Sequence, residues 1–212
     1  PVTGSAGELW YNAVDNALKF TFDYNAWSEV GNLLSARHYH SNAGVQNAAL
    51  AIGGYNHAAS AATGSVEEYN GTAWSVGGAL PINTEKRVGV GTQNAALAGA
   101  GTGTNSSEMY KYNGTAWSET ADIITGRPQY QGAGEQNAAY IFGAYVTDSD
   151  DTEAFNGMSW SECANLITGR GVGASGGTAN SAILVGGLPY GGSAKSCTEH
   201  YDGTTWSAGG AI

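Results

Sequence analysis

The histidines are the first residues in this chain whose type and spacing could support chemistry. His38 and His40 stand two positions apart, which would place both imidazoles on one face of a strand. Paired imidazoles can begin a zinc or copper site, but such a site needs a third or fourth ligand. The other two histidines, His57 and His200, lie far away in the sequence with no ligand-like spacing. We therefore expect no bound metal and interpret this segment as an ordinary polar strand.

Carboxylates and nucleophiles supply the other candidate chemistry. A cluster of acidic residues could bind Ca²⁺ through oxygen, and it comprises Asp148, Asp150, Asp151 and Glu153. Its spacing does not match an EF-hand loop, so a solvated acidic loop is the favoured interpretation. No plausible order of Ser, His and Asp emerges, and chance matches to Gly-x-Ser-x-Gly mean little among so many serines and glycines. We expect neither enzyme activity nor a cofactor.

A repeated aromatic pattern indicates the elements that must carry any site. A tryptophan followed by serine recurs at spacings of 47, 43, 43 and 46 residues, at Trp27, Trp74, Trp117, Trp160 and Trp206. Five positions before each tryptophan stands another aromatic residue, namely Phe22, Tyr69, Tyr112, Phe155 and Tyr201. Repeats of this length are typical of β-propeller blades, so the pattern predicts five units.

Each full unit carries signals for four short strands. In four units the aromatic residue is followed by Asn-Gly or Asp-Gly, a pair that forms tight hairpin turns. Apolar stretches that end in small residues precede these hairpins at 48–54, 95–101, 138–144 and 181–187, as expected for strands buried on both faces. A further segment begins at an arginine ten or thirteen residues after each of the first four tryptophans.

These units predict an all-β fold, a five-bladed β-propeller of four-stranded antiparallel blades in a single domain. The expected blades span about 1–30, 31–77, 78–120, 121–163 and 164–212, and the first is reduced to two or three strands. Aromatic side chains that bury about 150–250 Å² each would provide most of the packing between blades. If the seam at the reduced blade stays open, its strand edges could pair with a partner, including another copy of the chain.

The charge balance limits the kind of partner. The chain has 212 residues with 8 basic and 18 acidic side chains, a formal net charge of −10. Such a field repels phosphate backbones and anionic lipid surfaces. No apolar run approaches the roughly 20 residues that span a bilayer. We therefore expect no nucleic-acid partner and no membrane insertion.

The repeat resembles the Kelch repeat. An arginine, an apolar strand ending in Gly53-Gly54 or Gly186-Gly187, a tyrosine and a tryptophan follow one another in the Kelch order. Gln-Asn-Ala-Ala runs at 46–49, 93–96 and 136–139 look like the Kelch-like arrays of bacteriophage virion proteins, and segment 7–22 looks like a tail-fibre hairpin. The resemblance implies a virion or extracellular location, with other virion proteins or host-surface glycans and proteins as partners.

Two sets of residues are candidate binding groups on this scaffold. The first would form a partial ring at a channel mouth and bind carboxylate or phosphate; it comprises Arg37, Arg87, Arg127 and Arg170. The favoured alternative is structural: these arginines satisfy internal acids at Glu67, Glu153 and Glu199, or loop carbonyls between blades. The second set lies in loops that vary between repeats, where function tends to reside, and comprises Tyr55, His57, Tyr145, Tyr190 and Lys195.

The sequence therefore predicts a non-enzymatic module for binding or structure. The expected role is that of a domain in a phage tail or fibre protein, in contact with another virion protein or with a host surface. A lectin-like propeller with shallow sugar sites is the alternative, since the loop tyrosines could stack on sugar rings.

Overall fold

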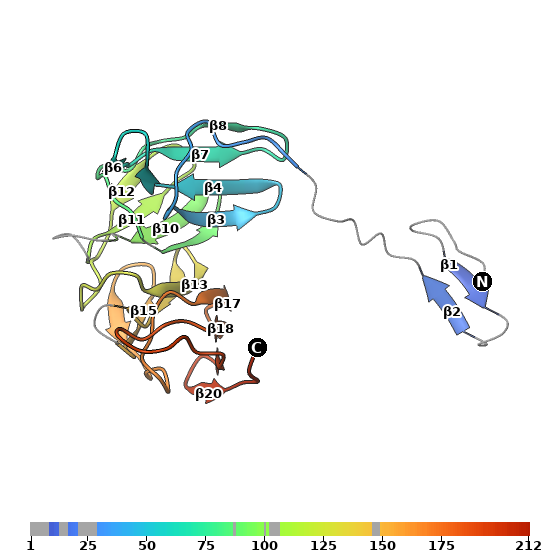
Figure 1. Cartoon of the computed structure of the whole chain (residues 1–212). Coiled ribbons are helices and arrows are strands. Elements are labelled where there is room, and N and C mark those ends of the chain that lie inside the picture. Colours follow the sequence, from blue (N-terminus) through green and yellow to red (C-terminus); the bar gives the residue numbers. More distant parts are fainter. Residues whose placement is uncertain are drawn as a thin grey trace. The chain divides into compact units, whose positions relative to one another are not determined.

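β-Strands are the regular elements of this chain. The computed structural model describes residues 29–86, 88–99, 101, 107–145 and 149–212, and the backbone of 9–12 and 17–20. Every helix or strand assigned in these residues is a strand (Figure 1). Within this part of the chain, no helix has the length and hydropathy that a membrane crossing requires. The chain divides into two compact units, Pro1–Gly31 and Asn32–Ile212.

The first unit contains a β-hairpin. Strands β1 (Leu9–Asn12) and β2 (Ala17–Phe20) pair antiparallel, with Leu9 opposite Phe20. This two-stranded sheet does not confirm the reduced blade predicted for residues 1–30. Phe22 and Trp27, which were expected to mark that blade, lie outside the described residues.

The second unit is a β-propeller with four described blades, each a four-stranded antiparallel sheet. Blade A consists of β3 (Ser41–Val45), β4 (Ala48–Ile52), β7 (Val66–Tyr69) and β8 (Trp74–Val76). Blade B consists of β9 (Gly89–Thr92), β10 (Ala95–Gly99), β11 (Met109–Tyr112) and β12 (Trp117–Glu119). Blade C consists of β13 (Gln131–Glu135), β14 (Ala138–Phe142), β15 (Thr152–Phe155) and β16 (Trp160–Glu162). Blade D consists of β17 (Ala174–Thr178), β18 (Ser181–Val185), β19 (Thr198–Tyr201) and β20 (Trp206–Ala208).

The strand content agrees with the sequence for four of the five expected blades. Blades A to D lie within the predicted boundaries 31–77, 78–120, 121–163 and 164–212, so the propeller of four-stranded antiparallel sheets is confirmed. A fifth blade is not confirmed. A short extra hairpin, β5 (Tyr55–Asn56) with β6 (Ala61–Ala62), lies in the loop between β4 and β7.

The predicted Asn-Gly turns join the third and outer strands. Across the first turn Tyr69 pairs with Trp74, and the side-chain oxygen of Asn70 accepts hydrogen bonds from the backbone N–H groups two and three residues on. Gly71 has a φ of +91°, a conformation that glycine adopts without steric cost. The same side-chain bonds recur at Asn113, Asn156 and Asp202. The local sequence therefore determines this hairpin in every described blade.

Tryptophan side chains lie between neighbouring blades. In blade B, Trp117 stacks on Tyr112 with 4.8 Å between ring centroids, and its indole N–H donates to the carbonyl of Gly78 at 2.9 Å. Both rings belong to a buried cluster with Leu50 of blade A. The equivalent side chains of blades C and D, Trp160 and Trp206, are each buried in a hydrophobic cluster of their own. Evenly spaced indole rings thus pack one blade against the next.

The four described blades of the propeller follow one another in a series, which we call the row, and each blade contacts the next. The inner strands lie side by side in the order β3, β9, β13 and β17. The side-chain amide of Gln93 in blade B donates to the carbonyls of Ala49 and Tyr69 in blade A, and Gln136 makes the same link from blade C to blade B. Blades A and D are the ends of the row, since Trp74 is only half-buried and β17 is largely exposed.

Candidate functional site

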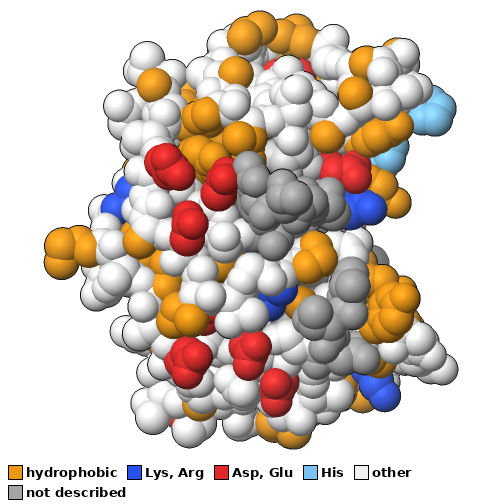
Figure 2. Space-filling model, turned by 90° about the vertical axis from the view of Figure 1, so that its left-hand side faces the viewer, with side chains coloured by type: hydrophobic (Ala, Val, Ile, Leu, Met, Phe, Trp, Pro, Cys, Tyr) orange, Lys and Arg blue, Asp and Glu red, His pale blue; other side chains and the backbone are white. Residues whose placement is uncertain are grey.

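One end of the propeller carries the connections that differ between blades. Successive strands of a blade run antiparallel, so the loops after the second and outer strands lie at the same end, which we call the loop end. It faces left in Figure 1 and towards the viewer in Figure 2. Most of this surface is uncharged, with hydrophobic side chains beside scattered acids (Figure 2).

Four residues at the loop end share an unusual backbone conformation. Their φ values lie between +56° and +58°, in the left-handed region that residues other than glycine rarely adopt, and they are Tyr39, Lys86, Gln129 and Val172. Each stands five residues before a glycine of the inner strand, so the four positions are equivalent in the repeat. The backbone is thus the same in four blades, while the side chain is in turn a phenol, an ammonium, an amide and a branched alkyl group.

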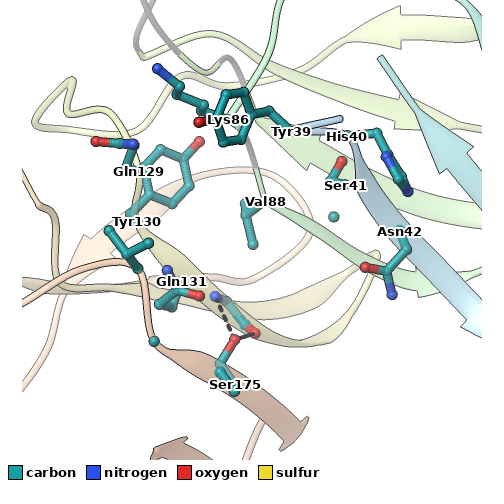
Figure 3. A pocket seen from close by; sticks show the side chains of 15 residues that line it. Tyr39, His40, Ser41, Asn42, Lys86, Val88, Gln129, Tyr130, Gln131 and Ser175 are labelled. Atoms are coloured by element: carbon teal, nitrogen blue, oxygen red, sulfur yellow. Dashed lines mark hydrogen bonds between the residues drawn. The ribbon is translucent and has the colours of Figure 1, made fainter. Parts of the chain in front are cut away.

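These four residues line a cavity of about 420 Å³ between the beginnings of the inner strands. Each blade also contributes wall residues, among them Ser41, Val88, Gln131 and Ser175 (Figure 3). A volume of this size is typical of small-molecule sites, which span roughly 300–1,000 Å³. Because every blade contributes, the cavity exists only where the propeller brings four distant segments together.

The charge of the cavity differs from that of the chain. Its described lining residues include no carboxylate, and Lys86 is the one among them with a permanent charge. The ammonium of Lys86 lies 4.9 Å from the ring centroid of Tyr39 and 3.7 Å from a carboxylate oxygen of Glu85. Desolvation and then the positive charge of Arg37 lower the pKa of His40, so this lining imidazole is neutral at neutral pH. Among its described lining residues, the site therefore combines one cation with neutral polar groups.

Two serines have different roles in the wall of the cavity. The hydroxyl of Ser175 in blade D donates to the carbonyl of Gly132 in blade C at 2.9 Å and joins the two blades (Figure 3). Ser41 of blade A is buried, and its hydroxyl has no hydrogen-bond partner among the described residues. An unpaired buried hydroxyl costs roughly 1–3 kcal/mol. Ser41 therefore offers an unused donor and acceptor at the cavity wall.

Three of the four arginines predicted at a channel mouth have their side chains buried in ion pairs. Arg127 is 1% exposed, and its guanidinium contacts the carboxylate of Glu153 at 2.6 Å. Arg37 contacts Glu67 at 2.9 Å, and the same pair in blade D is formed by Arg170 and Glu199. Each carboxylate also accepts two backbone N–H groups of the loop before its arginine. These guanidinium groups are therefore engaged with internal acids, which was the structural alternative.

The described residues of blade B form no such ion pair, and Arg87 is not equivalent to the other three arginines. In the other three blades the arginine stands two positions before the left-handed residue. In blade B, Thr84 stands two positions before Lys86 and therefore occupies the place of the arginine. Tyr110 replaces the glutamate, and Pro81 replaces the first of the two loop residues whose N–H groups that glutamate accepts in the other blades. Proline has no N–H, so this loop presents one N–H fewer for a carboxylate to accept. Three arginines and a threonine thus replace the expected set of four arginines, and Arg87 itself lies outside the described residues.

The loop residues predicted to bind a partner fall into separate places. Tyr145 of the loop in blade C and Tyr190 of the loop in blade D meet edge to face, with 5.6 Å between ring centroids. Tyr55 lies in β5 of blade A, and His57 and Lys195 are exposed. The structure therefore brings two of these five residues into contact, and both are tyrosines at the loop end.

The histidines do not form the pair on one strand face that their spacing predicts. Tyr39, between them, takes the left-handed conformation, which interrupts the alternation of a strand. His38 instead forms a backbone bridge with Tyr55, and His40 lines the cavity. No group of three or more metal-ligating side chains occurs in the described part of the chain. The two cysteines are free thiols, Cys163 and Cys197.

The residues at the cavity rim were missed in the sequence because they share no residue type. Their common property is the distance to a repeated glycine, at Gly44, Gly91, Gly134 and Gly177. Alignment of the repeats on this glycine, instead of on the arginines, would have placed Lys86 and Thr84 correctly. It would not have shown that the four rim positions meet.

Comparisons with known proteins add no relative. No protein-family model matches the chain, and no curated protein matches it significantly. The Kelch-like and phage-like features therefore depend on the repeat residues alone, and function has to be argued from geometry.

Proposed function

We propose that this chain is a non-enzymatic recognition module that binds its partner with the loop end. The observation that carries the proposal is the cavity lined by four equivalent backbone positions with four different side chains. Repeat proteins bind in this manner, with variable side chains and loops on a rigid repeated frame. Exposed aromatic rings at the same end support the proposal, since Tyr39 and Tyr190 are 54% and 60% exposed and tyrosine is enriched in interfaces.

A surface-binding experiment tests this proposal. Fluorescently labelled chain is incubated with intact bacterial cells and with isolated phage particles, and the bound fluorescence is measured. We expect Tyr39→Ala and Tyr190→Ala to reduce binding severalfold. The control Met158→Ala removes an exposed apolar side chain from a hairpin turn at the opposite end and should leave binding unchanged. Equal losses from both ends would contradict a binding site at the loop end.

We propose a phage tail or fibre protein as the setting of this module, with a virion protein or a host-surface protein or glycan as partner. The Gln-Asn-Ala-Ala runs and the N-terminal hairpin, which resemble those of phage virion proteins, support this setting. It implies a virion or extracellular location. The chain should co-purify with a virion subunit from a phage lysate, and recovery with cellular proteins alone would speak against this setting.

We also propose a Kelch-like ring of five blades, in which residues 1–30 supply the reduced blade. Trp27 stands six residues before Leu33, as Trp74 stands six residues before Leu80, so the repeat register extends into the first unit. Leu80 is buried between blades, whereas Leu33 is half-buried. Amide hydrogen exchange should show protection of β1 and β2 comparable with that of β4. Exchange of β1 and β2 at the rate of an unstructured peptide would rule out such a blade.

Carbohydrate binding is the second candidate function, and the cavity lining favours it. The amides of Asn42 and Gln129 and the hydroxyl of Ser41 can both donate and accept hydrogen bonds, as sugar hydroxyls require. A glycan array tests it, with Tyr39→Ala for the cavity and alanine variants for the loop tyrosines Tyr55, Tyr145 and Tyr190. Binding lost in the first variant alone would place the sugar in the cavity. An array with no bound glycan would leave the protein-contact role.

A further inference from the structure

We infer that the cavity at the loop end binds a sugar that carries a carboxylate group, with the carboxylate held by Lys86 and the sugar ring beside Tyr39. The inference rests on the proposed recognition function and names the class of ligand. The charge of the cavity, the backbone conformation of its rim and its unused polar groups each support it.

The charge of the cavity suits an anionic ligand. None of the 18 acidic residues of the chain is among the described lining residues, whereas Lys86 is. Its acidic neighbour Glu85 lies at 3.7 Å, close to the limit for an ion pair, and partly exposed pairs of this kind contribute little. A ligand carboxylate can therefore displace Glu85 at small cost, and no described lining acid repels it.

The conformation of the rim indicates that its side chains are present for contacts outside the fold. A left-handed backbone is strained for any residue with a Cβ atom, and most of all for Val172, which is branched at that atom. Glycine would relieve the strain, and the chain uses glycine at 33 other positions. Strained positions of this kind gather at ligand sites. A tyrosine, a lysine and a glutamine at such positions are the groups that hold a charged sugar.

Neutral groups complete the site for a ring rich in hydroxyls. The ring of Tyr39 is half-exposed, with the ammonium of Lys86 over it at 4.9 Å and the ring of His38 at 4.4 Å. Its exposed part and the ammonium together match a sugar with a carboxylate at its edge. The amides of Asn42 and Gln129 stand on different sides of the cavity (Figure 3). The hydroxyl of Ser41 is buried without a partner among the described residues, and a sugar hydroxyl can both donate to it and accept from it.

Titration calorimetry of the full chain tests the inference with glucuronic acid and N-acetylneuraminic acid, and with glucose as the uncharged match. We expect both acids to bind at least about ten-fold more tightly than glucose. Lys86→Gln should lower the affinity for the acids about ten-fold and bring it close to that for glucose, while Lys86→Arg should retain the affinity for the acids. Thermal unfolding of each variant confirms that it is folded.

A pair of charge-matched variants separates a local effect from the general field of the chain. Glu85→Gln removes the carboxylate that competes for Lys86, so we expect the affinity for glucuronic acid to rise severalfold. Glu135→Gln changes the net charge equally, at the exposed last residue of β13, and should leave the affinity unchanged. Equal gains in both variants would show that only the overall charge matters and would overturn the assignment to Lys86.

The outcomes distinguish this inference from the recognition function on which it rests. Equal binding of glucose and glucuronic acid, or an unchanged affinity in Lys86→Gln, overturns the inference while sugar recognition stands. Binding of none of the three sugars also overturns it. In that case the surface-binding experiment decides the rest: if Tyr39→Ala still reduces binding to cells or particles, the recognition function stands, and if it does not, both fail.

Discussion

Replacement of Trp117 by alanine is expected to destabilise the propeller much more than the same change at Trp74. Both residues open the outer strand of their blade, but Trp117 is 8% exposed between blades, whereas Trp74 is half-buried at the end of the row. Trp117 stacks on Tyr112, and its indole N–H donates to Gly78 at 2.9 Å. Trp74 keeps a similar stack within its own blade, at 5.1 Å from Tyr69. The comparison therefore isolates the contact between blades.

The magnitude follows from what each substitution removes. Truncation of a buried tryptophan to alanine costs about 3–5 kcal/mol, and the lost indole hydrogen bond, worth about 1 kcal/mol, places Trp117→Ala in the upper part of that range. For the half-buried Trp74, we expect a loss of about 1–2 kcal/mol. The difference of about 2–3 kcal/mol corresponds to about 4–12 °C in Tm for a domain of this size.

Urea unfolding followed by far-ultraviolet circular dichroism measures both losses. The dependence of the unfolding free energy on urea concentration should be the same in both variants, which shows that the same structure unfolds. Trp117→Phe serves as an intermediate variant, since it keeps an aromatic ring between the blades but not the indole N–H. A loss below about 1 kcal/mol for Trp117→Ala would refute the packing of indole rings between blades as the source of stability, whereas an equally large loss at Trp74 would show that a further blade covers that ring.

Three further predictions concern other parts of the propeller. Glu153→Gln leaves the buried guanidinium of Arg127 without its counter-ion and should cost about 3–5 kcal/mol in urea unfolding; the triple variant Arg127→Thr, Glu153→Tyr and Ile124→Pro, which copies blade B at these three positions, should cost less. The backbone N–H groups of Thr204 and Thr205, in the same hairpin turn, lower the pKa of Asp202. The ionised carboxylate therefore stabilises the fold above the normal pKa of an aspartate, and this stabilisation is lost as the pH falls through the lowered pKa. Asp202→Asn, the residue of the other three blades, should remove this acid-dependent part of Tm. Gly143 has a φ of +67°, and an added Cβ would lie 2.2 Å from a backbone carbonyl oxygen, so Gly143→Ala should cost more than about 1 kcal/mol. Gly176→Ala, with open space around its position, should be tolerated; equal effects at the two glycines would contradict the close approach.

The hairpins and strands could be predicted because neighbours in the chain determine them. Asn70 bonds to backbone groups two and three residues on, so the turn forms from local contacts whatever surrounds it. The apolar run at 48–54 becomes β4 and the hydrophobic run of each later repeat becomes the corresponding strand. The regular spacing of tryptophans predicted contacts between blades, since each ring must be buried against something.

The candidate site was less predictable because residue type and backbone position are different properties. Arg87 was grouped with the other arginines by type, although Thr84 stands at their position. The tyrosines Tyr145 and Tyr190 were expected in loops that vary between repeats, and the structure brings these two rings into contact. Nothing in the order of residues, however, indicates that the ammonium of Lys86 lies 4.9 Å from the ring centroid of Tyr39 at the rim of a cavity.

The sequence by itself determined the repeat, its turns and its strands, because these depend on interactions over a few residues. The tertiary structure decided which side chains of four different blades surround one cavity and which arginines form ion pairs with buried glutamates. It also decided which blades stand at the two ends of the row. Those outcomes depend on how twisted sheets pack against one another through contacts between residues 24 to 44 positions apart in the chain. Local preferences carry no information over such distances, so the charge and shape of the site emerge only when the blades assemble.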